Sequence, residues 1–304
     1  MYTLKDWIPI QKLNLRFLAE NPNAVHILEK NLDKLDQECL HNLSSNPNAI
    51  SIIEKILDKL DNNCWRELSK NPNAISILEV NQDKINFPSL SLNPNAIPLL
   101  KKNYKKLDVT CKCHLFTNPN AISILELVNQ DKIHWNWLSE NPNAIHLLEK
   151  NKDKICWRIL SSNPNAISIL EKNYKKLDIH CWRELSKNPN AISLLEANQD
   201  KIDWDSLSVN PNAIHLLEKN QHKINWYRLS ENPNAIHLLE KNQHKIDWDR
   251  LSKNPSIFDI IDYEAIKIRC LIYKEELIQT TMHPSRIIKL LDMGISIEEL
   301  DNCM

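Results

Sequence analysis

Apolar residues in this chain recur at spacings that suit short amphipathic helices. The segment 232–253 (NPNAIHLLEKNQHKIDWDRLSK) shows the pattern most clearly. The apolar positions of its first half are Ala235, Ile236, Leu238 and Leu239. They fall at i, i+1, i+3 and i+4, on one face of an α-helix. Trp248 and Leu251, spaced i and i+3, predict a second and shorter helix, so the segment predicts a helix-turn-helix.

Capping residues mark where these helices begin and end. Asn232 is the predicted N-cap of the first helix, and Pro233 suits its first helical position because the missing amide is harmless there. The helix should end over residues 240–242. Asp247 is the predicted N-cap of the second helix, which the next Asn-Pro stops.

The tetrapeptide that opens this segment is repeated through the chain. Asn-Pro-Asn-Ala begins at Asn21, Asn46, Asn71, Asn93, Asn118, Asn141, Asn163, Asn188, Asn210 and Asn232. A degenerate copy, Asn-Pro-Ser-Ile, begins at Asn254, and successive starts lie 22 to 25 residues apart. Helices this short need neighbours to be stable, so the repeats should stack. The sequence predicts an all-α fold: an α-solenoid of about eleven 22–25-residue helix-turn-helix repeats with N- and C-terminal caps, a rod about 100 Å long.

Three segments follow from this pattern. Residues 1–20 predict an N-terminal cap or half-repeat, and residues 21–253 a ten-repeat solenoid. Residues 254–304 predict a degenerate repeat and a helical C-terminal cap. This last segment includes an apolar helix over 285–293, with Gly294 as its C-terminal stop.

Some units are longer than others. The 25-residue units begin at Asn21, Asn46, Asn93 and Asn163, and they carry three extra residues before the second helix. We expect these linkers to protrude at different heights along one edge. A leucine-rich repeat is an alternative at this period, but its strand needs alternating leucines before the asparagine, and Trp-x-x-Leu-Ser has helical spacing instead.

Composition excludes several functional classes. The chain has one glycine, Gly294, so it lacks the residue that phosphate loops, nucleophile elbows and hairpin turns need. This argues against nucleotide-binding folds and against an enzyme. The formal net charge of −1 disfavours a general nucleic-acid binder. No apolar run approaches the length of a membrane span and no signal peptide is present, so a soluble, cytoplasmic protein is predicted.

Five of the eight cysteines share one slot, immediately before the aromatic position of the second helix. They are Cys39, Cys64, Cys111, Cys156 and Cys181. Equivalent slots in stacked helices lie about 10 Å apart, beyond the reach of a disulfide. Structural thiols in a reducing compartment are therefore predicted. The pair Cys111 and Cys113 leaves a zinc site open as a weaker alternative.

Stacking turns every position of the repeat into a column. The aromatic column reads Leu40, Trp65, Phe87, Lys112, Trp135, Trp157, Trp182, Trp204, Trp226 and Trp248. Its spacing predicts core packing, with an exposed stripe for stacking bases as the alternative. The two asparagine columns of the motif predict caps that could also form ladders between repeats.

Two charged columns run beside each other. The acidic column reads Glu29, Glu54, Glu79, Glu126, Glu149, Glu171, Glu196, Glu218 and Glu240. The lysine column reads Lys34, Lys59, Lys84, Lys106, Lys132, Lys154, Lys176, Lys201, Lys223 and Lys245. A solvated face of cancelling charge is the favoured interpretation, and a charged track for a polymer is the alternative.

The sixth position of the repeat points off the apolar face and predicts a partner-facing column. It contains His26, Ser51, Ser76, Ser123, His146, Ser168, Ser193, His215 and His237. Histidines in successive units lack the 3–4-residue spacing of a metal pair on one helix, so ligand and pH-switch roles are disfavoured. The pattern predicts no catalytic, cofactor-binding or metal-binding residues.

The unit Asn-Pro-Asn-Ala-Ile-x-Leu-Leu-Glu-Lys-Asn, followed by Lys-Ile-x-Trp-x-x-Leu-Ser, resembles the tandem-repeat proteins of giant, mimivirus-like DNA viruses that infect amoebae. The likeness spans residues 12–255 and extends loosely to 283–286. It implies a viral origin and a role during infection, without site residues to transfer.

These observations predict a non-enzymatic scaffold that binds a host or viral protein, without cofactors, in the cytoplasm. The alternatives are a helical-repeat RNA binder, motivated by the lysine column and opposed by the neighbouring glutamates, and a structural component of the virion.

Overall fold

The computed structural model describes residues 2–125, 133–281 and 283–293, and nearly all of its regular structure is helical. The all-α prediction is therefore confirmed. The chain forms two compact units, residues 2–259 and a C-terminal unit that starts at Ile260. The aromatic repeat segments are helices rather than strands, which excludes the leucine-rich alternative.

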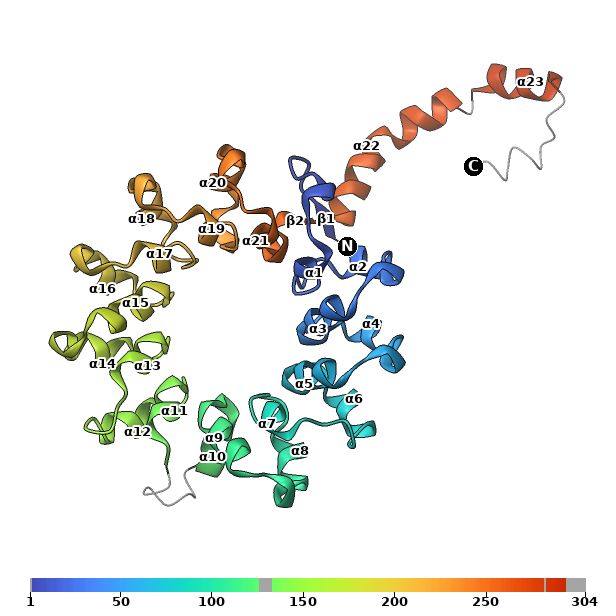
Figure 1. Cartoon of the computed structure of the whole chain (residues 1–304). Helices are drawn as coiled ribbons and strands as arrows, with labels where there is room; N and C mark the ends of the chain where they lie inside the picture. The colour runs from blue at the N-terminus through green and yellow to red at the C-terminus, as the bar shows by residue number, and fades with distance from the viewer. Residues whose placement is uncertain (1, 126–132, 282, 294–304) are drawn as a thin grey trace. The chain divides into compact units, whose positions relative to one another are not determined.

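Within the unit 2–259, the helices form two concentric layers (Figure 1). The inner helices precede each Asn-Pro motif and carry the aromatic column. They are α1 (Leu15–Leu18), α3 (Gln37–Ser45), α5 (Asn62–Lys70), α7 (Phe87–Leu90), α9 (Val109–Thr117), α11 (Trp135–Glu140), α13 (Trp157–Ser162), α15 (Ile179–Lys187), α17 (Trp204–Leu207), α19 (Trp226–Leu229) and α21 (Trp248–Lys253).

The outer helices follow the motif and carry the sixth position of the repeat. They are α2 (Val25–Glu29), α4 (Ile50–Glu54), α6 (Ile75–Val80), α8 (Ile97–Lys102), α10 (Ile122–Leu125), α12 (Ile145–Lys150), α14 (Ile167–Lys172), α16 (Ile192–Glu196), α18 (Ile214–Lys219) and α20 (Ile236–Lys241). Short 3₁₀ turns such as Gln243–Lys245 connect outer to inner helices in most units.

The Asn-Pro-Asn-Ala motif forms a turn before the outer helix, and its first asparagine caps that turn. In the segment 232–253 the predicted cap is confirmed: Asn232 accepts a hydrogen bond from the amide of Asn234, and Pro233 begins the 3₁₀ turn Pro233–Ala235 that leads into α20. The α-helix itself begins only after the alanine. In the unit at Asn210, the side-chain oxygen of Asn210 accepts a hydrogen bond from the amide of Asn212, and its carbonyl accepts one from Ala213. This Asx turn delays the helix until Ile214, and the buried Ala213 takes the N-cap position. The predicted second cap is confirmed, because Asp247 accepts from the amide of Arg250 at 2.8 Å.

The three extra residues of the long units add one helical turn to the inner helix. The inner helices α3, α5, α9 and α15 are nine residues long and begin one turn earlier than those of the short units. An aspartate caps each of them: Asp36, Asp61, Asp108 and Asp178. The prediction of protruding linkers is therefore wrong: the aspartate caps a longer inner helix, and the added residues are part of that helix.

The core lies between the two layers. Alanine, isoleucine and leucine of every unit are buried there, and the alanine of each Asn-Pro-Asn-Ala motif is fully buried. The aromatic column packs against this core, but only Leu40, Trp65 and Trp182 are fully buried within it, while Lys112 is exposed. The other rings are partly covered by lysines of the next unit, as at Lys223 over Trp204 at 4.4 Å.

The first asparagine of each motif joins its unit to the preceding one. The side-chain nitrogen of Asn210, which is fully buried, donates to the carbonyls of Ser186 at 3.0 Å and Asn188 at 2.9 Å. The same two bonds recur at all eleven first asparagines and form what we call the asparagine ladder. The predicted ladder is thus confirmed, and it is buried.

The ladder closes on itself. The side-chain nitrogen of Asn21 donates to the carbonyls of Ser252 at 3.0 Å and Asn254 at 2.9 Å, which places the first unit directly after the last. Inner helix α1 packs against α21. Lys12 lies over the ring of Trp248 at 4.5 Å, as the lysine column does elsewhere. The open rod predicted from the sequence is therefore wrong: the repeats form a closed ring (Figure 1).

The ends of the array reinforce this closure. Strand β1 (Tyr2–Leu4) pairs with β2 (Phe258–Ile260), and the amide of Lys5 donates to the carbonyl of Ile257 at 3.0 Å. The half-repeat before Asn21 thus contacts the last unit, where an open array would leave it facing water. Phe258 lies in the segment 254–304 that was expected to be a degenerate repeat and a helical cap, but it begins β2, where the chain extends to meet β1.

The C-terminal unit contains two helices, α22 (Tyr263–Thr281) and α23 (Pro284–Asp292). The helix predicted over 285–293 corresponds to α23. Gly294, its predicted stop, lies outside the described residues. Several large apolar side chains of this unit are exposed, among them Ile268 and Tyr273.

Replacing a first asparagine should destabilise the ring far more than replacing a second one. Asn210→Ala removes two buried bonds to the preceding unit and the bond that holds its own turn, so we expect a loss of about 3 kcal/mol in the free energy of unfolding. Asn212→Ser removes one exposed bond to Pro189, and serine already occupies this slot at Ser256, so about 1 kcal/mol or less is expected. Urea denaturation followed by circular dichroism measures both. Equal losses would contradict a structural role specific to the buried ladder.

Candidate functional site

The sixth-position column lies on the outer helices, as predicted, and most of it is exposed. The exposed members are Ser51, Ser76, His146, Ser168, Ser193, His215 and His237. The side chain of Ser123 lies outside those described. His26 is half-buried: its ring meets Phe258 edge-on at 5.6 Å, and burial lowers its pKa. Partner binding by this column stays a prediction.

Outer-face histidines contact the acidic column of the preceding unit. His215 Nε2 lies 2.9 Å from a carboxylate oxygen of Glu196, and His237 Nε2 lies 2.8 Å from one of Glu218. Both members of each pair are nearly half exposed, so each pair contributes little to stability. The outer face therefore carries alternating polar groups, in line with the solvated face that the sequence favoured.

In the described part of the chain, most lysines of the lysine column are not free to form a charged track. Six of its members lie over an aromatic ring of the preceding unit at 4.4–5.2 Å: Lys106, Lys154, Lys176, Lys201, Lys223 and Lys245. Each ammonium group thus engages a ring face, which weakens the idea of a column poised for a phosphate backbone.

A groove of about 520 Å³ crosses the inner helices α11, α13 and α15. Trp137 is partly exposed at 38% within this groove, beside Arg158 and Ile159 of the next unit. Glu140 and Glu184 supply negative charge around them. The groove thus combines an aromatic ring, an apolar side chain and charges of both signs.

The sequence analysis did not identify Trp137 because the repeat pattern has only one aromatic position per unit. Trp135 occupies the column, so the second tryptophan of Trp135-Asn-Trp137 must lie elsewhere on the helix. The second tryptophan in this unit was the sequence signal that could have indicated an exposed aromatic residue. His114 and His134 both meet it edge-on, with ring centroids 6.1 Å and 6.3 Å from it.

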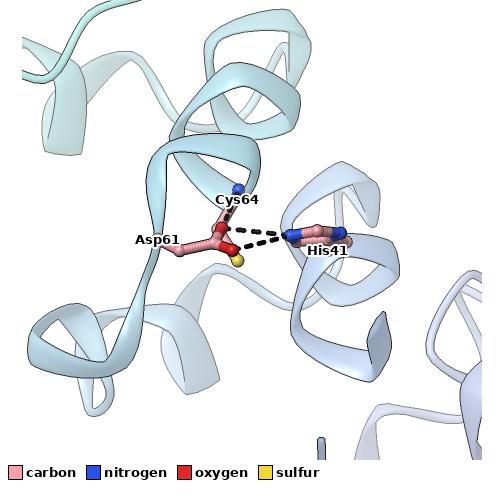
Figure 2. Close-up of side chains that lie close together, drawn as sticks. All are labelled: His41, Asp61 and Cys64. Carbon is pink, nitrogen blue, oxygen red and sulfur yellow. Dashed lines mark hydrogen bonds and ion pairs between the residues drawn. The ribbon is translucent and has the colours of Figure 1, made fainter. Parts of the chain in front are cut away.

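A second cluster joins three chemically reactive side chains across two units. His41 of α3 faces Asp61 and Cys64 at the start of α5 (Figure 2). His41 Nε2 lies 3.0 Å from Oδ1 and 3.1 Å from Oδ2 of Asp61, and Asp61 Oδ1 accepts from the amide of Cys64 at 2.8 Å. One ligand atom from each residue lies within 4.8 Å of the other two.

The electrostatics of this cluster follow from its place at a helix start. The hydrogen bond from the Cys64 amide, with help from His41, lowers the pKa of Asp61 to about 2. Burial raises the pKa of the Cys64 thiol to about 11, so it is protonated when no cation lies beside it. The same aspartate-to-amide bond recurs at Cys39, Cys111 and Cys181, whose thiols are also buried with raised pKa values.

The sequence prediction missed this cluster because its members belong to different units. His41 follows the aromatic column by one residue, and Asp61 caps the next inner helix 20 residues later. In the parts of the chain that the structure describes, no other group of three or more such side chains is close enough to share an ion. The zinc site considered at Cys111 and Cys113 is therefore absent there, because these residues gather no third ligand on α9.

Comparison with known proteins adds no relative to this description. No family model matches the chain, and no curated protein or solved structure matches it. Among the described residues, no helix is long and apolar enough to cross a membrane.

Removing the charge of Asp61 should change how stability depends on acidity. Because the folded protein holds the pKa of Asp61 near 2, below its usual 3.8, the unfolded chain takes up this proton first and stability falls as pH drops through that window. Asp61→Asn removes the carboxyl group that takes up the proton. It keeps the helix cap, because asparagine caps the inner helices at Asn86 and Asn225. The stability advantage of the wild type over Asp61→Asn should therefore shrink between about pH 5 and about pH 2, measured by urea denaturation. An advantage independent of pH would contradict the assignment.

Proposed function

We propose that the closed array is a non-enzymatic scaffold that binds a protein segment in the groove at Trp137. The observation that carries this proposal is the groove itself, where a partly exposed tryptophan and Arg158 lie together on adjacent inner helices. Tryptophan and arginine are the side chains most enriched among residues that dominate binding energy at protein interfaces.

The charge pattern of the inner helices supports a protein ligand over a nucleic acid. Both signs alternate there in close pairs, such as Lys187 with Glu184 at 3.0 Å and Arg250 with Glu231 at 2.6 Å. A phosphate backbone needs a surface of one sign, whereas a polypeptide can match a mixed one. RNA binding remains the alternative, and its motivating lysines are engaged with aromatic rings.

The groove suits a segment with an apolar anchor flanked by charged residues. Trp137 and Ile159 would contact the anchor, while Arg158 and the two glutamates would pair with its flanks. The resemblance to giant-virus repeat proteins supports a host or viral partner in the cytoplasm. A role as a virion component is compatible with the same ring, and the sixth-position column could offer that partner or another a second face.

A non-enzymatic role is supported by the tasks that the reactive side chains already perform. The aspartates at Asp36, Asp108 and Asp178 cap helices, and the cysteines beside them are buried with raised pKa values. A nucleophile or general base needs the opposite environment.

Competitive capture tests this proposal. Immobilised protein would be exposed to host lysate, and bound proteins quantified while soluble wild-type protein competes. We expect a saturable protein partner whose retention falls at least about tenfold with Trp137→Ala or Arg158→Ala, because a hot-spot residue contributes about 2 kcal/mol or more.

His237→Ser is the matched control, since serine fills the same slot in other units and the change lies on the outer face. The His237→Ser protein should retain the same partner in the same amount as the wild-type protein. If Trp137→Ala retains every saturable partner, or if none exists while RNA is captured at low salt, the proposal fails.

A further inference from the structure

Two pairs of ligand side chains face each other across the interface between α3 and α5. Gln37 and His41 are four residues apart on α3 and so share a face of that helix. Asp61 and Cys64 are three residues apart at the start of α5 and lie close to His41 (Figure 2). Gln37 Oε1 lies 4.0 Å from Cys64 Sγ.

The spacing of these atoms suits one ion. Adjacent donors around a tetrahedral zinc ion with bonds of about 2.0–2.1 Å are about 3.3 Å apart. His41 Nε2 and the Asp61 oxygens are 3.0 and 3.1 Å apart, and the Cys64 sulfur lies within 4.8 Å of both. To bind one ion, the three atoms would therefore need only a local adjustment of their side chains.

We propose that His41, Asp61 and Cys64 bind a divalent cation of the zinc class and thereby join two adjacent repeats. The ligands are the nitrogen, carboxylate and sulfur donors that zinc prefers. Asp61 Oδ1 keeps its bond to the Cys64 amide, which leaves Oδ2 for the metal. Nε2 of His41 gives the proton that it shares with Asp61 to solvent as it binds the metal, and Nδ1 takes one up, so the bound imidazole is neutral with its proton on Nδ1. The Cys64 thiol releases its proton to solvent as the sulfur–metal bond forms. Water or Gln37 completes the fourth position.

The ion can reach this site from solvent. The side chains of His41 and Asp61 are 28% and 41% exposed, whereas Cys64 is fully buried beneath them. An ion would therefore enter past the imidazole and carboxylate and meet the sulfur last. Two exposed ligands and one buried ligand are consistent with a site that exchanges its ion.

The other long units have the aspartate and the cysteine without the histidine, and there the aspartate serves as a helix cap. Their caps recur at Asp36, Asp108 and Asp178, each bonded to the amide three residues on. The positions equivalent to His41 in the preceding inner helices hold Arg16, Pro88 and Arg158, and none of these can ligate a cation. The interface between α3 and α5 thus differs from its counterparts by one imidazole, which converts a helix cap into a three-ligand set.

Cobalt(II) titration of the full chain under a non-chelating reductant tests the site, followed by displacement with Zn²⁺. We expect one Co²⁺ per chain with a sulfur-to-cobalt charge-transfer band in the near ultraviolet and tetrahedral bands in the visible, both bleached by one equivalent of Zn²⁺. Cys64→Ser should abolish the charge-transfer band. His41→Arg should weaken binding at least about 100-fold, because it removes a direct ligand and places a guanidinium opposite Asp61, as Arg16 lies in the equivalent slot.

Cys181→Ser is the matched control, because Cys181 has the same buried cap while Arg158 occupies the position equivalent to His41 in the preceding inner helix. It should bind cobalt as the wild type does. The proposal is overturned if no charge-transfer band forms with the wild type, if the band persists in Cys64→Ser, if His41→Arg binds cobalt as tightly as the wild type, or if Cys181→Ser loses the band. Arginine occupies the equivalent position in other units, so His41→Arg should fold. That variant therefore decides the test if Cys64→Ser does not fold.

Discussion

The buried carboxamide of the first asparagine in each repeat is the interaction on which this structure depends. Its nitrogen donates to two carbonyls of the preceding unit, and its oxygen holds the turn that starts its own outer helix. A buried amide that met neither partner would cost several kilocalories per mole, so every unit requires a preceding neighbour. An open array leaves its first unit without one. The ladder from Asn21 to Asn254 removes that end, and closure satisfies the requirement all round the ring.

Closure also explains the irregular ends of the array. The half-repeat before Asn21 supplies an inner helix that packs on α21, and the last motif continues as β2 instead of an outer helix. Both departures from the repeat occur where the two ends meet. A closed ring whose units are held on both sides offers fixed surfaces, which suits the scaffold role and the proposed ion between α3 and α5. The bound ion would add to the same contact between units that the ladder makes.

The local structure could be predicted from the sequence because its signals are local. The helical spacing of Ile236 and Leu239, the cap at Asp247 and the ladder of asparagines all follow from positions within one or two repeats. Closure of the ring could not be predicted, because it depends on the small rotation between successive units. No single residue determines that rotation. The groove at Trp137 and the cluster at His41 escaped for a related reason: each combines residues from different units, and only their spatial stacking brings them together.

The distance between the first and last units tests the closed ring most directly. Arg16 on α1 and Asp249 on α21 are both exposed, so donor and acceptor dyes can be attached at these two positions through introduced bio-orthogonal residues. Because neighbouring helices pack about 10 Å apart, single-molecule energy transfer should be high in native buffer and should fall when urea unfolds the protein. An open rod of the same repeats would separate the dyes by roughly 100 Å and give almost no transfer. Low transfer in native buffer would contradict closure.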